Sequence, residues 1–249
     1  MTEVAAIGSI PPLERGEAEA LVDEEYGRFE AVLRSLGPSD WGAPTDCPPW
    51  TVRDMATHVL AACEAIGSFR EMAHQVRAAR RIEGIQIDAI NKVQIDERRE
   101  LTGEDILRAF PIAASRSVRA RKRLPAFVRS RGRTAEFAPG HSEPWTLAFL
   151  FDVIYTRDTW MHRVDIARAT GRPIELSAAH DGRIVADLVS DWARRHASPV
   201  SLTLTGPAGG RFEMGTGGPG IEVEAVTFAR NISGRDAPSD GLLSIRTPF

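Results

Sequence analysis

Four long segments with helical periodicity constrain the fold more than any other feature of the sequence. In each of them apolar residues recur every three or four positions. The segments are residues 14–36, 51–69, 102–124 and 145–169. Gly37 and Pro38 end the first segment, and Gly171 and Pro173 end the last. Helices of this kind bury their apolar faces against one another, so the pattern predicts a helical bundle.

The hydrophobic periodicity of the sequence changes after Pro173. A helical segment at 178–196 is followed by VSLTLTG and IEVEAV, whose alternation predicts strands, and by a short final helix. The glycine clusters GPAGG and GTGGPG lack the context of a phosphate-binding loop and are interpreted as hairpin turns. We therefore predict an α+β protein with a helical bundle at 1–172 and a small α+β domain at 173–249.

The remaining segments of the bundle are predicted from breakers and composition. Residues 1–12 are interpreted as a mobile lead-in closed by two prolines. Residues 86–99 continue helically, whereas 130–144, which are rich in glycine, proline and charge, are predicted to form a loop. Phe69 closes the apolar face predicted for the second helix.

Composition excludes several classes of function. The net charge of -3 gives no general attraction to nucleic acid or to anionic membranes. No stretch approaches the roughly 20 apolar residues of a membrane span, and the N-terminus lacks the features of a signal peptide. Two cysteines are too few for a disulfide framework. We expect a soluble, cytoplasmic protein, and whether it is a monomer or a homodimer stays open.

An acidic residue within an apolar stripe is the most informative anomaly. The stripe on the fourth long helix consists of Leu147, Leu150, Phe151, Ile154 and Met161. At about 100° per residue, Asp158 projects into the middle of this stripe and His162 lies one turn further along. A buried carboxylate is costly unless it is paired or bound to a cation. His58, on the inward face of the second helix, is the best candidate for a third donor. Three such ligands leave one coordination position of a tetrahedral metal open, as in catalytic zinc sites.

Simpler interpretations remain at this point. A lone buried histidine such as His58 is more often hydrogen-bonded in a core than bound to a metal. Asp158 can instead pair with Arg157, Arg163 or an arginine of another helix. Asp165 is interpreted as a structural residue or one that orients a ligand histidine.

Two segments resemble signatures of the mycothiol-dependent maleylpyruvate isomerase family. TDCPPWTVRDMATHVLAACEAI resembles the segment with the family's first metal histidine, and DTWMHRVDIARATGRP resembles the segment with the acid and the second histidine. The ending, with ISGRDAPSDGLL, is similar to the family's small second domain. The resemblance implies a DinB-like four-helix bundle, a sterol-carrier-like second domain and the metal ligands His58, Asp158 and His162. It also implies that Arg235 helps to bind an acidic substrate. The best-known member has a glutamate in place of Asp158.

The function implied by this resemblance is that of an actinobacterial enzyme with zinc, or another divalent metal, and mycothiol as cosubstrate. The metal would favour the thiolate, which would add to a small electrophile, so the enzyme would be an isomerase or an S-transferase. Two alternatives stay open. One is a hydrolase that uses metal-activated water on a small amide or thiol conjugate. The other is a non-catalytic metal- or ligand-binding protein of stress or detoxification.

Overall fold

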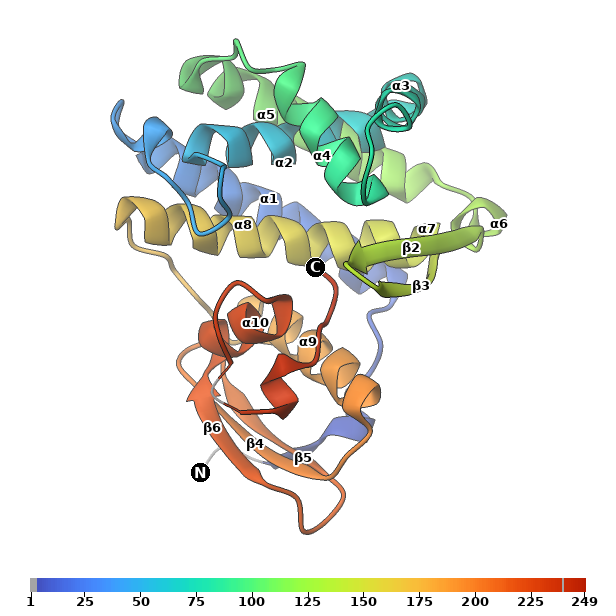
Figure 1. Ribbon diagram of the computed structural model, residues 1–249, viewed down its shortest axis with the longest axis vertical. Coiled ribbons are helices and arrows are strands. Elements are labelled where there is room, and N and C mark those ends of the chain that lie inside the picture. The colour runs from blue at the N-terminus through green and yellow to red at the C-terminus, as the bar shows by residue number, and fades with distance from the viewer. Residues whose placement is uncertain (1–3, 239) are drawn as a thin grey trace. The chain divides into compact units, whose positions relative to one another are not determined.

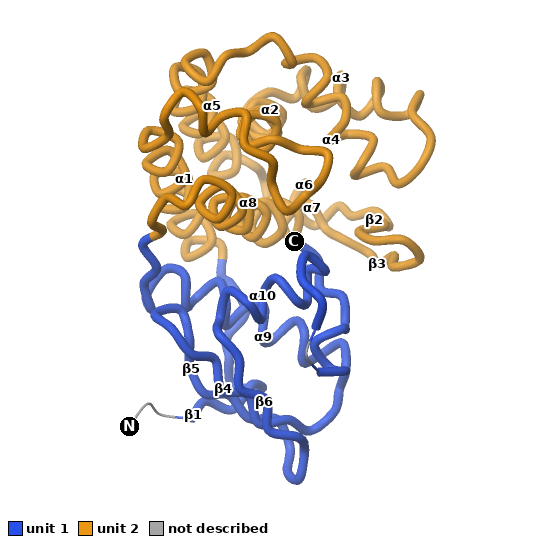
Figure 2. The backbone as a smooth tube through the Cα atoms, turned by 60° about the vertical axis from the view of Figure 1, so that its left-hand side comes forward, with its two compact units in different colours: residues 1–14, 175–249 blue, residues 15–174 orange. Residues whose placement is uncertain are grey.

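The computed structural model describes residues 4–238 and 240–249, with the elements labelled in Figure 1. Contacts within the chain divide it into two compact units, which Figure 2 distinguishes by colour. Unit 2 comprises Arg15–Ile174, and unit 1 combines the segment up to Glu14 with Glu175–Phe249. Unit 2 is mainly helical and unit 1 contains a four-stranded sheet, so the predicted α+β class is confirmed.

Four long helices form the frame of unit 2. They are α1 (Arg15–Ser35), α2 (Val52–Gly67), α5 (Gly103–Arg123) and α8 (Tyr155–Thr170). Both α1 and α2 contact α5 and α8, which closes the bundle (Figure 1). Side chains from all four helices meet in one apolar core, which includes Phe29, Leu33, Met55, Leu60, Ile106, Phe110 and Ile166. Burial of these side chains is the main contribution to the stability of the bundle.

Shorter elements of unit 2 complete the surroundings of the bundle. They are η2 (Asp40–Gly42), α3 (Phe69–Ala79), α4 (Gln86–Asp96), α6 (Ala126–Arg129), β2 (Gly132–Ala138), β3 (His141–Thr146), α7 (Leu147–Phe149) and the π-helical η3 (Leu150–Ile154). Helices α3 and α4 contact each other, and both contact α2. This arrangement brings polar side chains of α3 and α4 against the helix that carries His58.

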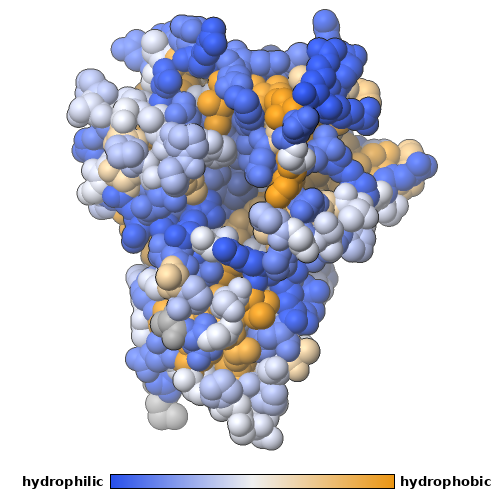
Figure 3. All heavy atoms as spheres, viewed as in Figure 1, coloured by the Kyte–Doolittle hydropathy of each residue, from blue (hydrophilic) through white to orange (hydrophobic). Residues whose placement is uncertain are grey.

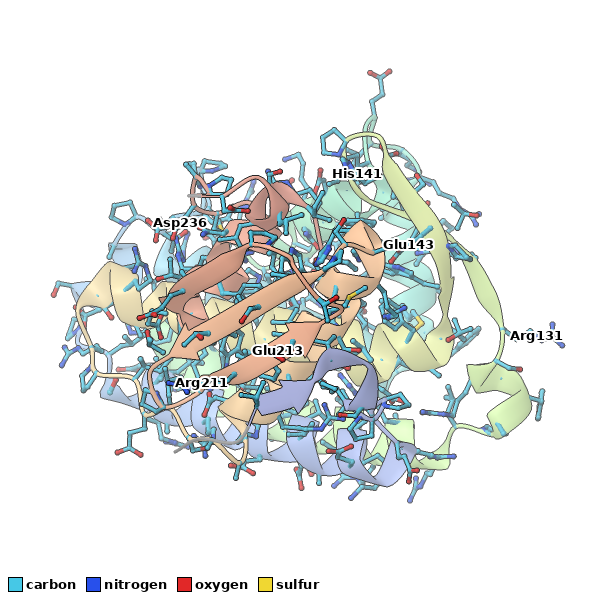
Figure 4. All side chains as sticks on the ribbon, turned by 90° about the horizontal axis from the view of Figure 1, so that it is seen from below. Arg131, His141, Glu143, Arg211, Glu213 and Asp236 are labelled. Atoms are coloured by element: carbon cyan, nitrogen blue, oxygen red, sulfur yellow. The ribbon has the colours of Figure 1, made fainter. Side chains whose placement is uncertain are left out.

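Two predictions for unit 2 are wrong. Residues 130–144 are not a loop, because β2 and β3 pair in an antiparallel hairpin, with His141 close to the turn (Figure 4). The breakers and charges of this segment hide the strands, although Pro139 and Gly140 mark the turn between them. Phe69 does not face the core: it is 86% exposed. Ser68 interrupts the helix and caps α3, which turns Phe69 outward.

Unit 1 is a sheet with two helices. Its elements are β1 (Val4–Ala6), η1 (Ile7–Ser9), α9 (Asp181–His196), β4 (Val200–Thr205), β5 (Gly210–Met214), β6 (Gly220–Glu224), α10 (Ala225–Ser233) and η4 (Leu242–Ser244). The strand order is β1-β5-β4-β6, with β4 antiparallel to β5 and parallel to β6. Leu202 pairs with Phe212 on one side and Ile221 on the other, and all three are buried. The turn between β4 and β5 confirms the hairpin interpretation of the first glycine cluster. For the second cluster, at 215–220, this interpretation is wrong, because it connects β5 to β6 and β6 pairs with β4.

The N-terminal segment differs from its prediction as a mobile lead-in to the bundle. Val4–Ala6 pairs with β5 in parallel, beside Arg211 and Glu213 (Figure 4), and Ile7 is buried. The segment therefore belongs to unit 1 and not to the bundle. A short strand gains its stability from a distant partner, so sequence periodicity does not reveal it. Residues 1–3, which are part of the same prediction, lie outside the described residues.

Hydrophilic residues predominate on the face shown in Figure 3, where apolar residues form small patches. Within the described residues, no helix combines the length and apolar character that crossing a bilayer requires.

Candidate metal centre

His58 is carried by a helix whose start is fixed by a capping box. Thr51 Oγ1 accepts a hydrogen bond from the Asp54 backbone N–H at 3.3 Å, and the Asp54 carboxylate accepts one from the Thr51 N–H at 3.0 Å. This reciprocal pair satisfies two amides at the helix end and begins α2 at Val52. His58 consequently lies at the end of the second turn, where its side chain is buried.

Asp158 and His162 lie one turn apart on α8, which follows the π-helical turn η3. Their spacing of four residues places both side chains on one face of the helix. His162 is buried, whereas 21% of the Asp158 side chain is exposed. Asp158 therefore lies at the edge of the packed interior and not in its middle.

The two histidines meet on opposite oxygens of the same carboxylate. His58 Nε2 lies 3.2 Å from Asp158 Oδ2, and His162 Nε2 lies 3.2 Å from Asp158 Oδ1. The imidazole rings are nearly perpendicular, at 88°, with their centroids 5.2 Å apart. The structure thus brings together the three residues that the sequence predicted as ligands.

The electrostatics of this cluster favour a charged Asp158. Burial acts to raise the pKa of the Asp158 carboxyl, but His162 and His58 outweigh it through charge and hydrogen bonding, so this pKa lies far below its ordinary range. Asp158 is therefore ionised across the physiological pH range.

Arg163 does not neutralise Asp158. Its guanidinium forms a buried ion pair with Glu25, at 2.7 Å from Nε to Oε1 and 3.1 Å from Nη2 to Oε2. The described partners of Asp158 are the two histidines. The arrangement therefore favours the cation-binding interpretation of Asp158 over simple pairing with a neighbouring arginine.

Other side chains pack around the two imidazoles. The Trp50 ring lies 5.2 Å from the ring of His58 and 5.9 Å from that of His162, centroid to centroid. Asp165 is fully buried, with Oδ2 lying 3.4 Å from His162 Nδ1, and the Cys47 thiol donates to the same oxygen at 3.8 Å. Asp165 is thus placed where it can orient His162, so that Nε2 faces the cluster.

The donor set fits a divalent cation. One ligand atom from each of the three residues lies within 4.8 Å of the others. Donors bound to one tetrahedral zinc are about 3.3 Å apart, as follows from metal–ligand distances of about 2.0–2.1 Å. The 3.2 Å separations between each Nε2 and an Asp158 oxygen are close to this spacing. His58, Asp158 and His162 could therefore hold zinc with one position left open.

Sequence reasoning missed one neighbour of the cluster, Gln94 on α4. Its Oε1 lies 2.7 Å from His58 Nδ1, and both side chains are buried. Gln94 follows the buried Val93 and lies five residues after the buried Ala89. Its position on the inward, apolar face of a short amphipathic helix is the sequence signal that could have identified it.

Arg235, the remaining predicted site residue, lies in unit 1, just after the left-handed Gly234 that ends α10. Its backbone N–H donates to the Arg230 carbonyl at 2.9 Å, which holds the chain close to the helix end. Arg230 itself pairs with Asp236 at 2.8 Å. The predicted contact between Arg235 and an acidic substrate stays a prediction.

Comparison with known proteins now adds to this geometry. No curated protein sequence matches the chain. Two solved structures match over 94% of this chain and 93% of theirs, each with a TM-score of 0.59. One is the mycothiol-dependent maleylpyruvate isomerase, 15% identical, and the other is a histidine-to-alanine variant of such an isomerase, 13% identical. These likenesses confirm the expected fold.

The family comparison is more specific than the structural one. The family described as the mycothiol maleylpyruvate isomerase N-terminal domain matches residues 22–167, which is more than half of the chain. The match includes all three candidate ligands, the whole of the first similar segment at 45–66 and the first ten residues of the second, 158–167. The chain therefore belongs to the mycothiol maleylpyruvate isomerase N-terminal domain family.

Proposed function

We propose that this protein is a metal- and mycothiol-dependent enzyme that activates a thiol for addition to a small, acidic electrophile. The observation that carries the proposal is the convergence of His58, Asp158 and His162, with both Nε2 atoms 3.2 Å from the carboxylate. Family membership supports the choice of thiol, because the matching structures are of mycothiol-dependent isomerases. The metal in this proposal is zinc.

The chain's own residues prepare the centre for a thiol. A bound divalent cation would lower the thiol's pKa and so supply a thiolate at neutral pH. With a cation bound, His58 and His162 would each present a nitrogen lone pair to it, and Asp158 would contribute negative charge. The Trp50 ring packs beside both imidazoles and limits the access of water from its side.

The proposed isomerisation needs no redox partner. The thiolate sulfur adds to one carbon of a cis double bond conjugated to a carbonyl, and the π electrons move onto the carbonyl oxygen. Rotation about the resulting single bond follows. The electron pair then returns, the carbon–sulfur bond breaks, and the thiolate leaves the trans isomer. If a proton reaches the carbanion before the thiolate leaves, the product is a thioether, and the enzyme acts as an S-transferase.

Arg235 has a separate part in the proposal, as the group that binds a substrate carboxylate. A guanidinium can donate two parallel hydrogen bonds to a carboxylate, whereas lysine offers a point charge. Arg235→Lys should therefore raise KM for an acidic substrate and leave zinc content unchanged. Equal KM values for the two proteins would argue against this role.

Zinc content and mycothiol binding test the proposal directly. Purified wild-type protein should contain about one zinc per chain, and His162→Ala much less, because a ligand is lost. His74→Ala is a matched control, since His74 is exposed and pairs with Glu97 on the surface. Wild-type protein should then bind mycothiol in a titration and isomerise maleylpyruvate only when mycothiol is present. Absence of both zinc and mycothiol binding would overturn the proposal, and zinc-dependent cleavage of a small amide or thiol conjugate without added mycothiol would indicate a hydrolase instead.

A further inference from the structure

The two ring nitrogens of His58 both face acceptor oxygens. Nε2 lies 3.2 Å from Asp158 Oδ2, and Nδ1 lies 2.7 Å from Gln94 Oε1. A neutral imidazole carries a proton on only one nitrogen, so it can donate to only one of these oxygens. A cation at Nε2 resolves the conflict if the proton stays on Nδ1. The position of that proton therefore decides whether His58 can be a ligand.

An amide side chain can in principle present either its oxygen or its NH₂ group to Nδ1. With the oxygen toward the ring, Nδ1 keeps its proton and Nε2 offers a lone pair. With the NH₂ group toward the ring, the proton moves to Nε2 and the lone pair points away from Asp158. The orientation of the Gln94 amide is thus a question with consequences for metal binding.

A chain of hydrogen bonds fixes this orientation from its far end. The Gln94 Nε2 group donates to Gln75 Oε1 at 2.8 Å. The Gln75 Nε2 group donates to the Ala61 carbonyl at 3.1 Å and to Glu71 Oε1 at 2.9 Å. A carbonyl and a carboxylate can only accept, so the Gln75 amide must turn its nitrogen toward them. Its oxygen then accepts from Gln94, and the Gln94 oxygen is left to face His58.

This chain of hydrogen bonds is buried, so water cannot replace any of its donors or acceptors. Gln75 and Gln94 are each 1% exposed, and His58 is 4% exposed. If both amides turned over, the Gln75 oxygen would face the Ala61 carbonyl and the Glu71 carboxylate, with no proton between them. Buried acceptors without donors are costly, so the observed direction is strongly preferred.

The far end of the chain is itself anchored by an ion pair. Arg98 Nη2 lies 2.8 Å from Glu71 Oε1, and Arg98 Nε donates to Glu64 Oε2 at 2.9 Å. Burial acts to raise the pKa of Glu71, but hydrogen bonds from Gln75 and Arg98 together lower it. Glu71 is therefore a permanent acceptor at neutral pH, and Gln75 keeps its direction.

We propose that Gln94 and Gln75 act as positioning residues that hold the proton of His58 on Nδ1 and so present Nε2 to a zinc ion. The inference rests on the proposed function only for the identity of the ion, because the hydrogen bonds belong to the protein alone. Glutamine in place of the more common carboxylate or backbone partner gives His58 an uncharged acceptor.

The tautomer is measured by long-range ¹H–¹⁵N NMR of the imidazoles in metal-free protein at pH 8. The Asp158→Ala background removes the competing acceptor at Nε2. There His58 should carry its proton on Nδ1, and adding Gln94→Leu or Gln75→Leu should shift population to the Nε2–H form. A dominant Nε2–H form with both glutamines present would overturn the proposal.

Zinc affinity in otherwise wild-type protein gives an independent readout. Gln94→Leu and Gln75→Leu should each weaken zinc binding roughly 10–100-fold in chelator competition, the usual effect of losing an outer-shell partner. Gln94→Glu keeps an acceptor toward Nδ1 but loses the donor to Gln75 Oε1, so it should recover only part of the affinity. Gln86→Leu is the matched control on α4, because Gln86 is the first residue of the helix, about two turns before Gln94, and is only partly buried.

The outcomes separate this inference from the proposed function. If the Nδ1–H form of His58 is selected but the wild-type protein binds no zinc, the positioning role of the two glutamines is supported and the proposed metal-dependent function is refuted. Normal zinc binding by Gln94→Leu and Gln75→Leu, both folded as judged by circular dichroism, would refute the positioning role of the two glutamines. The proposed metal-dependent function would then still stand.

Discussion

The Arg121 guanidinium donates to the backbone carbonyl of Phe151, an oxygen that the π-helical turn has released from its usual partner. In a regular α-helix this carbonyl would accept from the Tyr155 N–H, but that amide donates instead to Leu150, five residues earlier. Arg121 also donates to the Tyr26 hydroxyl at 2.8 Å. An arginine of α5 thus stabilises the irregular turn immediately before the helix that carries Asp158 and His162.

We expect Arg121→Met to destabilise the protein by about 2–4 kcal/mol, because the Phe151 carbonyl and the Tyr26 hydroxyl both lose a buried donor. Arg119→Met is the control, since Arg119 is exposed on the same helix and should change stability by less than about 0.5 kcal/mol. Urea unfolding followed by circular dichroism gives both values. Equal stabilities of the two variants would contradict the assigned role of Arg121.

The buried pair between Glu25 and Arg163 gives a second prediction. Glu25→Leu should cost about 3–5 kcal/mol of unfolding free energy, because it leaves a buried guanidinium without its carboxylate. Adding Arg163→Met should restore much of this loss. The exposed pair of Glu30 and Arg34 is the comparison, and its removal should cost about 0.5 kcal/mol or less. A Glu25→Leu variant that is as stable as the wild type in urea unfolding would contradict this prediction.

The three candidate ligands could be predicted from the sequence because their signal is local. Asp158 and His162 are neighbours on any helix, and His58 lies on the predicted inward face of the second helix. The motif resemblance implied the same three residues. The π-helical turn was beyond such reasoning, because a constant 100° per residue was applied across a segment in which the helix contains a wider turn. This explains why Asp158 lies at the edge of the interior and not at its centre.

Most features that sequence reasoning missed depend on contacts between distant residues. The strand Val4–Ala6 is defined by its pairing with β5 at the other end of the sequence. The hairpin of β2 and β3 is local, and it was hidden by a composition rich in breakers and charge. Gln94 likewise looks like any polar residue of α4 until α4 is packed against α2. The direction of a hydrogen-bond chain depends on every donor and acceptor in it, so it can be deduced only once the fold is known.

Asp158 variants test the candidate centre through charge and length separately. Asp158→Asn keeps the shape but removes the charge that faces both imidazoles, and zinc affinity should fall by more than about tenfold. Asp158→Glu keeps the charge and adds one methylene, and it should retain zinc binding within about tenfold of the wild type. Chelator competition measures both affinities. Unchanged zinc binding by Asp158→Asn would show that this carboxylate is not a ligand.

Asp40 predicts a pH dependence of stability. Its carboxylate accepts from the Gly37 N–H at 2.8 Å and from Arg172 Nη2 at 2.6 Å, and these bonds, the first above all, lower the pKa of Asp40. Since the folded-state pKa lies below the unfolded value of roughly 4, the stabilisation is complete above that pH and disappears as pH falls through the folded-state pKa. Asp40→Asn should therefore melt below the wild type at pH 7, with a difference that stays constant down to about pH 5 and shrinks only as the pH falls further toward about 3. A constant difference for Asp40→Asn across this range would mean that the charge of Asp40 contributes nothing to the link between the end of α1 and Arg172.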